Sequence, residues 1–319
     1  MRVLVWHVHG SWLTGFLQGA HDYLLPVVPG RGPDGRGRAR TWSWPANARE
    51  VTPAGLREAA CDVVVLQRAD ELRLLEEWTG LRAGVDVPAV YVEHNAPPEK
   101  AAATVHPLAG RSDIPVVHVT AFNALMWDCG TAPTAVIEHG VPDPGYRYTG
   151  ESERLGVVVN EPVRRWRVAG TDVLLRLAET VPVEVYGMGM AALAQRAPSL
   201  TGFLHDDVPQ DAMHDLLARH RAYLHPYRWT SLGLSLIEAM LLGLPVLALA
   251  TTAAPESVPT TAGVVSADPG ALAAAARRWL ADPAEAHERG LAAREHALAR
   301  FGLARFLDQW DQVLKEVVR

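Results

Sequence analysis

Residues 224–256 read LHPYRWTSLGLSLIEAMLLGLPVLALATTAAPE, and this stretch decides the fold. It opens with the end of an apolar strand and a turn, after which residues 234–242 have the composition of a helix. Gly243 follows directly, in the position of a C-cap glycine. Residues 245–250 are an uninterrupted apolar run of strand length, as expected for a parallel strand buried on both faces. The stretch therefore predicts a strand, a helix and a second strand.

Glu238 is the one charged residue in this predicted helix. The apolar side chains leave no solvent-facing stripe at 100° per residue, so the helix is expected to be buried. A buried carboxylate is costly unless it is hydrogen-bonded. Glu238 could form a capping box with Ser235 and bond a backbone N–H at the helix start. Alternatively, the free amides of residues 233–235 attract a phosphate while Glu238 accepts hydrogen bonds from sugar hydroxyls. The spacing alone does not decide between the two.

The run TSLGLSLIEAMLLGLPVLA, residues 230–248, resembles the signature of the GT-B glycosyltransferases of retaining family 4, the group 1 type. That signature is a glutamate, seven residues and a second glutamate, followed by Ala-Met and Gly-x-Pro-Val. Glu238 matches the second glutamate, and Pro226 stands four residues before the first. The first position is Thr230 here. The resemblance implies that Glu238 holds the nucleotide ribose, whereas the Thr230 position touches the donor sugar, so the departure leaves the identity of the sugar open.

Two loops in the first half of the chain are candidates for substrate contacts. A strand over residues 2–8 leads toward a helix near Thr14, and Gly10 and Gly15 lie where α/β folds place phosphates or, in GT-B enzymes, the acceptor. A plain strand-to-helix turn is the alternative for both. A buried strand over residues 87–92 ends in Glu93-His94-Asn95. The resemblance implies that His94 lines the donor-sugar pocket, and the alternative is a histidine hydrogen-bonded to its own loop.

A loop with three arginines, residues 160–172, precedes a predicted helix in the second half. Family members carry Gly-Arg and Lys-Gly here and bind the diphosphate with the Arg and Lys. This chain has Asn160-Glu161 and Ala169 at those places, so other cations are needed, and guanidinium groups suit bidentate phosphate contacts. An exposed basic loop is the alternative. The donor-binding residues that the resemblance implies are Arg164, Arg165, Arg167, Gly187, Thr230, Ser231, Gly233, Leu234, Ser235 and Glu238.

Two further polar clusters receive structural interpretations. Residues 29–49 are rich in Gly, Pro and Arg and lack periodicity, which predicts a solvated loop rather than a site for an anionic acceptor. Asp206 and Asp207 are similar to a metal-binding Asp-x-Asp, but adjacent residues on a strand point to opposite faces. We therefore interpret them as acids at the entry of the next helix.

Composition limits the classes of function. The chain has 319 residues, 49% of them hydrophobic, which is enough for two domains. Its net charge of −6 gives no electrostatic footprint for nucleic acid. No apolar run reaches the length of a membrane span, and the N-terminus is too short in apolar length for a signal peptide, so a cytoplasmic protein is expected. Cys61 and Cys129 are expected to be reduced structural thiols.

These features predict an α/β protein of GT-B fold, with two doubly wound parallel-sheet (Rossmann-like) domains facing a cleft. Residues 1–145 would form the acceptor-side domain and residues 146–300 the nucleotide-sugar donor domain. Residues 301–319 would form a helix that crosses back to the first domain.

The predicted function is that of a retaining glycosyltransferase, of hexosyltransferase type, as in bacterial enzymes of this family. It would transfer a sugar from a nucleoside diphosphate sugar to a small-molecule or glycan acceptor, without a metal or another cofactor. His94 and Glu238 are the residues expected to act in catalysis. A nucleotide-sugar epimerase on the same fold is one alternative. A non-catalytic homologue that serves as a partner subunit is the other, because of Thr230 and Ala169. A monomer or homodimer is expected, and a partner chain stays possible.

Overall fold

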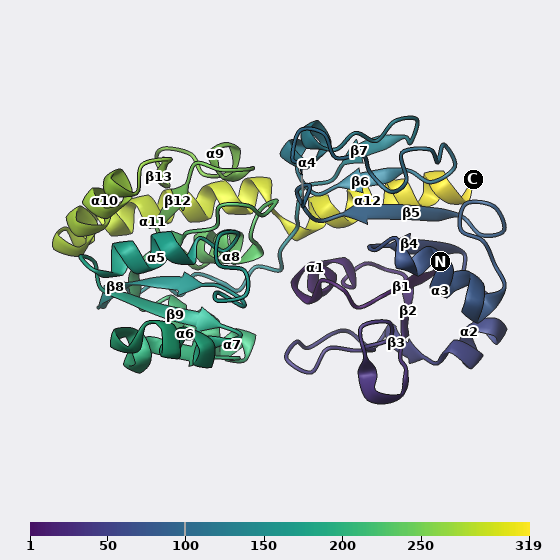
Figure 1. Cartoon of the computed structure of the whole chain (residues 1–319), viewed down its shortest axis with the longest axis horizontal. Coiled ribbons are helices and arrows are strands. Elements are labelled where there is room, and N and C mark those ends of the chain that lie inside the picture. Colours follow the sequence, from purple (N-terminus) through teal and green to yellow (C-terminus); the bar gives the residue numbers. More distant parts are fainter. Residues whose placement is uncertain (99) are drawn as a thin grey trace. The chain divides into compact units, whose positions relative to one another are not determined.

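The computed structural model describes residues 1–98 and 100–319 and divides them into two compact units. Unit 1 comprises Met1–Pro142 and Leu303–Arg319, and unit 2 comprises Asp143–Gly302. Each unit is built on one sheet whose strands are all parallel, as predicted (Figure 1). Within the described residues, no helix is long and apolar enough to cross a membrane.

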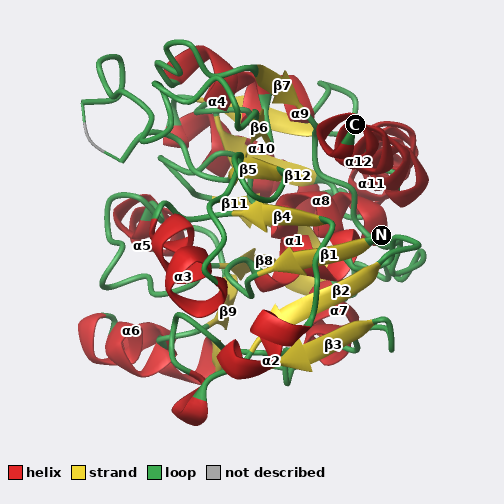
Figure 2. Ribbon diagram, turned by 90° about the vertical axis from the view of Figure 1, so that its right-hand side faces the viewer, coloured by secondary structure: helices red, strands yellow, loops and turns green. Residues whose placement is uncertain are grey.

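Unit 1 contains a seven-stranded sheet with the order β3-β2-β1-β4-β5-β6-β7. Its central strand β4 is a fully buried Val-Val-Val-Leu run, which is the expected composition of a parallel strand covered on both faces. The helices α1 and α12 pack together on one face, and α2 and α3 pack together on the other (Figure 2). The elements are β1 (Arg2–Val5), α1 (Gly10–Phe16), β2 (Asp22–Pro26), the 3-10 helix η1 (Pro29–Arg31), β3 (Ala48–Val51), α2 (Pro53–Glu58), β4 (Val63–Leu66), α3 (Asp70–Thr79), β5 (Ala89–Glu93), β6 (Val116–His118), α4 (Ala121–Met126), β7 (Thr134–Val136) and α12 (Leu303–Val318).

Unit 2 contains a six-stranded sheet with the order β10-β9-β8-β11-β12-β13. The helix α8 packs on both α7 and α11, and α10 packs on α5 and on the strands β8, β11, β12 and β13. The elements are β8 (Ser152–Val158), α5 (Thr171–Ala178), β9 (Val183–Gly187), α6 (Met190–Arg196), the 3-10 helix η2 (Pro198–Phe203), β10 (Leu204–Asp206), α7 (Gln210–Leu217), β11 (His220–His225), α8 (Leu234–Leu242), β12 (Val246–Leu249), α9 (Ala254–Ser257), β13 (Gly263–Ser266), α10 (Pro269–Ala281) and α11 (Pro283–Arg300).

The helix α8 has the predicted bounds and the predicted environment. Residues 236–242 are all buried, because the helix has apolar side chains around its whole circumference. It ends at Gly243, which adopts the left-handed conformation with φ of 96° and is the expected C-cap glycine. The strand that follows, β12, is fully buried as well.

Two predictions about unit 1 are wrong in detail. The first helix begins at Gly10 and not near Thr14. Residues 29–49 are not a solvated loop without fixed contacts, because Arg31 joins the segment to Glu50 and Arg38 joins parts of the segment to one another. Arg31 donates two hydrogen bonds to the carboxylate of Glu50, at 2.7 and 3.0 Å, and Arg38 donates to backbone carbonyls, including that of Pro45 at 2.8 Å.

Arg221 is a buried cation that joins β11 to the end of α10. Only 5% of the residue is exposed. Its guanidinium donates to the carbonyls of Gly150 at 2.9 Å, Trp279 at 3.1 Å and Leu280 at 2.7 Å. Two of these carbonyls lie at the C-terminus of α10, where a positive charge is favoured by the helix dipole.

We expect Arg221→Met to lower the free energy of unfolding of unit 2 by about 3 kcal/mol, because it removes the donor to two buried carbonyls and one half-buried carbonyl. Urea denaturation followed by circular dichroism measures the change. Arg277→Met, at an exposed position of the same helix α10, is the control and should change the stability by less than about 0.5 kcal/mol. Equal stability of the two variants would contradict the structural role of Arg221.

Candidate active site

The candidate site of unit 2 lies at the carboxyl ends of two neighbouring central strands. The chain leaves β8 toward β9 on one side and leaves β11 toward β12 on the other, so these two strands form the switch point of the sheet. Open parallel sheets bind their ligands at this place. The loops that meet there are residues 159–170, after β8, and residues 226–233, after β11.

These two loops form one hydrogen-bonded assembly. The backbone N–H groups of Arg228 and Trp229 both donate to the carbonyl of Val168, at 2.9 and 3.2 Å. Gly170 has a φ of 69°, and a Cβ atom there would lie 1.7 Å from the carbonyl oxygen of Pro226. Only glycine fits this approach, so the loops are fixed relative to each other.

The three predicted loop arginines differ in their surroundings. The side chain of Arg164 is 71% exposed and lies 3.5 Å from Glu161. The side chain of Arg167 is 69% exposed and donates to Asp172 at 2.5 Å. Arg165 is half-buried, and its guanidinium carbon lies 5.8 Å from the ring centre of Tyr227, within cation–π range. Among the described residues Arg165 has no ion-pair partner, so it keeps its charge for a ligand.

Glu238 lies in α8 beside α7 and is only 5% exposed. One oxygen accepts a hydrogen bond from the side-chain amide of Gln210 at 2.6 Å, and the other lies 3.5 Å from Nε2 of His214. Gly233 is the N-cap of α8 and no side chain caps the helix. Ser235 instead accepts a hydrogen bond from the hydroxyl of Tyr223 at 2.9 Å. The capping box is therefore not formed, and the start of α8 offers its first backbone N–H groups to a ligand.

The other predicted donor residues line the same edge of the sheet. Gly187 ends β9 with φ of 138°, and a Cβ atom there would lie 2.0 Å from the carbonyl oxygen of Val159. Thr230 and Leu234 are half-buried, and Ser231 is buried with its carbonyl 3.3 Å from the N–H of Ala253.

The role predicted for Asp206 is wrong. Its carboxylate accepts from the N–H groups of Gly189 at 2.9 Å and Met190 at 3.4 Å, so it caps α6 and not the helix that follows it in the sequence. Asp207 adopts a left-handed backbone with φ of 48°. No group of three or more His, Cys, Asp or Glu side chains in the described ranges 1–98 and 100–319 is arranged to hold a metal.

His94 of unit 1 follows β5 and is only 8% exposed. Its ring lies 4.1 Å from that of His9, at 35°, and 5.0 Å from that of Trp12, at 81°. Burial, with the nearby His9 and His139, holds the pKa of His94 well below its usual range, so the ring is neutral at physiological pH. Its Nε2 atom has no hydrogen-bond partner among residues 1–98 and 100–319.

The two neighbours of His94 have structural roles. Glu93 accepts from the backbone N–H of Asn95 at 2.7 Å and lies 3.3 Å from the ring of buried His106. The indole N–H of Trp127 donates to the carbonyl of Asn95 at 2.8 Å. These contacts fix the loop, and His94 is the buried member of the trio whose side chain has an atom without a partner among residues 1–98 and 100–319.

Gly10 and Gly15 are positions in α1 where a side chain would collide with neighbouring segments of unit 1. A Cβ atom at Gly10 would lie 2.5 Å from the ring of Trp42. At Gly15 it would lie 2.5 Å from the carbonyl oxygen of Gly140. The predicted substrate contacts of these glycines stay predictions.

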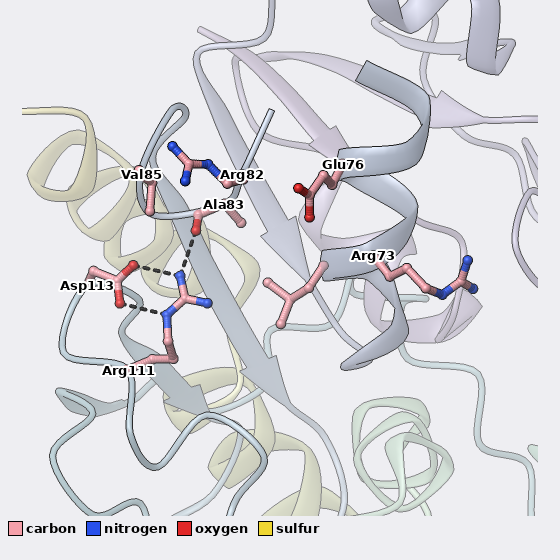
Figure 3. Close-up of a pocket in the computed structure, with 8 residues that line it drawn as sticks. Arg73, Glu76, Arg82, Ala83, Val85, Arg111 and Asp113 are labelled. Atoms are coloured by element: carbon pink, nitrogen blue, oxygen red, sulfur yellow. Dashed lines mark hydrogen bonds and ion pairs between the residues drawn. The ribbon is translucent and has the colours of Figure 1, made fainter. Parts of the chain in front are cut away.

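A surface groove of about 410 Å³ in unit 1 is separate from these sites (Figure 3). It lies against α3 and the loops that precede β5 and β6, at the opposite end of the strands from the edge that binds ligands in such sheets. Each arginine of the groove is paired with a carboxylate: Arg73 with Glu77, Arg82 with Asp86 and Arg111 with Asp113. The groove is therefore not built for an anion.

Comparison with known proteins gives one family match, which lies in unit 2. Residues 168–282 match the family model described as Glycosyl transferases group 1. This part of unit 2 is therefore similar to the group 1 glycosyl transferases. No curated protein matches the sequence. The predicted class of enzyme, a glycosyltransferase, is confirmed by this match together with the fold.

Solved structures confirm the GT-B fold of this glycosyltransferase. Sucrose-phosphate synthase from Thermosynechococcus elongatus is 16% identical, with a TM-score of 0.72 over 99% of each chain. HepE from Anabaena, solved in complex with UDP, is 17% identical, with a TM-score of 0.69 over 99% of this chain and 100% of its own. A glycosyltransferase from Rickettsia africae is 15% identical, with a TM-score of 0.64 over 100% of this chain and 98% of its own.

Sequence reasoning missed several residues that shape the candidate site of unit 2. Gln210 and His214 contact Glu238 from 28 and 24 positions away in the chain. Arg228 donates to both carboxylate oxygens of Asp172, at 3.0 Å each. It therefore neutralises the carboxylate at the start of α5 that also accepts from Arg167. No local signal predicts these pairs, because each depends on how distant elements pack.

Glu71 is a buried carboxylate at the switch point of unit 1, where β4 leads into α3. It is fully buried and accepts from the N–H of Gln67 at 2.7 Å and from Nε of Arg68 at 3.0 Å. Burial raises the pKa of Glu71 from 4.5 to about 7 despite these hydrogen bonds.

The raised pKa of Glu71 predicts a stability that depends on pH. A carboxyl whose pKa is higher in the folded state binds more protons when folded, so its contribution is fully present below about pH 4.5 and is lost as the pH rises through about 7. We expect Glu71→Gln, compared with wild type by urea denaturation at pH 5 and pH 8, to remove up to about 3 kcal/mol of this dependence. The same pH dependence in both proteins would refute the assignment.

Proposed function

We propose that the chain is a retaining glycosyltransferase that moves a hexosyl group from a nucleoside diphosphate sugar to a small-molecule or glycan acceptor, without a metal. The observation that carries the proposal is the buried carboxylate of Glu238 in a helix whose N-terminus no side chain caps. The group 1 match of unit 2 and the neighbours solved with UDP and UDP-glucose support a nucleotide-sugar donor.

Two kinds of group bind the donor: positively polarised groups bind its diphosphate, and a carboxylate binds its ribose. The N–H groups at the start of α8 and the guanidinium of Arg165 bind the diphosphate, since a helix N-terminus and a planar cation both favour phosphate oxygens. Glu238 accepts hydrogen bonds from the ribose hydroxyls. Thr230, at the position where the family has a glutamate, offers a hydroxyl instead of a carboxylate to the sugar.

The chemistry needs charge stabilisation more than a protein nucleophile. Negative charge grows on the leaving diphosphate as the glycosidic bond breaks, and Arg165 and the amides of α8 stabilise it. The acceptor hydroxyl attacks the anomeric carbon on the face that the diphosphate leaves and passes its proton to an oxygen of the departing diphosphate, which retains the configuration. His94 of unit 1 is neutral, and its Nε2 atom, without a hydrogen-bond partner among the described residues, is suited to a hydrogen bond with a sugar hydroxyl.

The test is a thermal-shift screen of wild type and Glu238→Ala against UDP, GDP, ADP and their sugar conjugates. We expect one nucleotide family to raise the Tm of wild type, and Glu238→Ala to lose most of that shift while staying folded. Incubation of the stabilising nucleotide sugar with candidate acceptors then assays transfer. Stabilisation that survives in Glu238→Ala would place the nucleoside elsewhere.

A partner subunit without catalysis is the second candidate. Ala169, where relatives have the diphosphate-binding lysine, is fully buried, and Glu161 brings a carboxylate to the place of the family's arginine. A flat response of well-folded protein across the whole nucleotide panel would favour this candidate over the enzyme.

A further inference from the structure

Two side chains of α7 contact the carboxylate of Glu238, one at each oxygen. Gln210 Nε2 donates to one carboxylate oxygen at 2.6 Å. Nε2 of His214 lies 3.5 Å from the other oxygen. Gln210 and His214 are four residues apart on α7, so both side chains lie on the face of α7 that packs against α8.

The environment of His214 fixes which ring nitrogen carries the proton. The residue is only 6% exposed, and its Nδ1 atom has no hydrogen-bond partner in residues 1–98 and 100–319. A buried N–H without an acceptor is costly, so a proton on Nε2 is favoured over one on Nδ1; this Nε2 atom lies 3.5 Å from the Glu238 carboxylate and also 3.5 Å from the amide nitrogen of Gln210. His214 therefore turns an N–H toward the second carboxylate oxygen, at the 3.5 Å distance of an ion-pair contact.

The hydrogen-bond acceptor sites that stay free on the carboxylate match the two hydroxyls of a ribose. An ionised carboxylate has about four acceptor sites, two on each oxygen. Gln210 uses one site on the first oxygen, and the ring of His214 lies 3.5 Å from the second oxygen. At least one acceptor site is left on each oxygen, which suits a group that donates two hydrogen bonds from neighbouring atoms. The 2′ and 3′ hydroxyls of a ribose are such a group.

We propose that Gln210 and His214 are positioning residues that orient the Glu238 carboxylate so that each oxygen accepts one ribose hydroxyl of a nucleoside diphosphate. This inference rests on the proposed function and adds two residues from a different helix to it. Without them the Glu238 side chain would rotate, and only one of its oxygens would meet the ribose at a time.

The experiment measures discrimination between ribose and deoxyribose by titration calorimetry. Wild type is titrated with UDP, GDP and ADP, and the tightest of the three is compared with its 2′-deoxy form. We expect wild type to prefer the ribose form by about tenfold, the usual size of one hydrogen bond to a charged group. Gln210→Ala and His214→Ala should bring this ratio close to one, while their affinity for the deoxy form changes little. His214→Gln, which keeps a side-chain donor, should restore most of the ratio.

Inorganic pyrophosphate and Asp211→Asn are the controls. Pyrophosphate has no ribose, so its affinity should be equal in all variants, whereas a general loss of structure would lower it. Asp211 is exposed on α7 next to Gln210, and Asp211→Asn should keep the wild-type ratio. If Glu238→Ala loses the ratio but Gln210→Ala and His214→Ala keep it, the positioning role is overturned and the proposed function stands. If wild type binds none of the three nucleotides, both are overturned.

Discussion

Replacing Arg165 by alanine is expected to weaken the binding of a nucleoside diphosphate about 30- to 150-fold and to leave the affinity for the corresponding nucleoside unchanged. Arg165 is the half-buried arginine of the loop after β8, and it stands over Tyr227 without an ion-pair partner among the described residues. A partly buried guanidinium that meets a phosphate forms charge-assisted hydrogen bonds worth about 2–3 kcal/mol. Titration calorimetry with UDP, GDP or ADP and with the matching nucleoside separates the phosphate contribution from that of the ribose and base.

The same loop supplies the matched controls for Arg165. Arg164 and Arg167 have highly exposed side chains, and they are paired with Glu161 and Asp172. We expect Arg164→Ala and Arg167→Ala to change the affinity less than threefold, because exposed, already paired charges contribute little. Arg165→Lys should recover part of the loss, since it keeps the charge but not the bidentate geometry. Equal losses in all three alanine variants would show a diffuse electrostatic effect and not a defined phosphate contact.

Local periodicity explains which parts of the fold were predictable. The helix α8 and its Gly243 cap follow from the apolar run and the glycine, and no distant information is needed. The outer strand β3 reads Ala-Arg-Glu-Val and has two exposed polar residues, so it lacks the long apolar run that marks a central strand. Its neighbour β2 begins at an exposed aspartate and ends at a proline, which are both poor strand signals.

The site was predictable as a set of loops but not as a set of contacts. Residues 164–167 read Arg-Arg-Trp-Arg, and nothing in that order shows that only Arg165 lies over Tyr227. The environment of Glu238 also could not be read from the sequence. Its spacing from Ser235 fits a capping box equally well, and the hydrogen bond from Gln210 forms only because α7 and α8 lie side by side. Residue types and spacing therefore locate the site, whereas packing between distant elements assigns the roles.

Gly170→Ala is expected to lower the free energy of unfolding of unit 2 by about 3 kcal/mol or more and to reduce nucleotide affinity at the same time. The left-handed backbone alone costs an alanine about 1–2 kcal/mol. The new Cβ would also lie 1.7 Å from the carbonyl oxygen of Pro226, so the two loops of the switch point must separate. Their separation breaks the hydrogen bonds from Arg228 and Trp229 to Val168, each worth about 1 kcal/mol. Arg165 and Tyr227, one on each loop, then lose their relative position.

Gly145→Ala separates the cost of the backbone conformation from the cost of the clash. Gly145 lies in the same unit with φ of 85°, but a Cβ atom there would meet nothing within 4 Å. Urea denaturation should therefore show a loss of about 1–2 kcal/mol for Gly145→Ala, and calorimetry should show unchanged nucleotide affinity. If Gly170→Ala were no more destabilising than Gly145→Ala, the close approach to Pro226 would not hold the loops together. In that case the alignment of Arg165 with the start of α8 would have to depend on other contacts between the loops, of which the hydrogen bond from Asn160 N–H to the Tyr227 hydroxyl, at 3.3 Å, is the next to test.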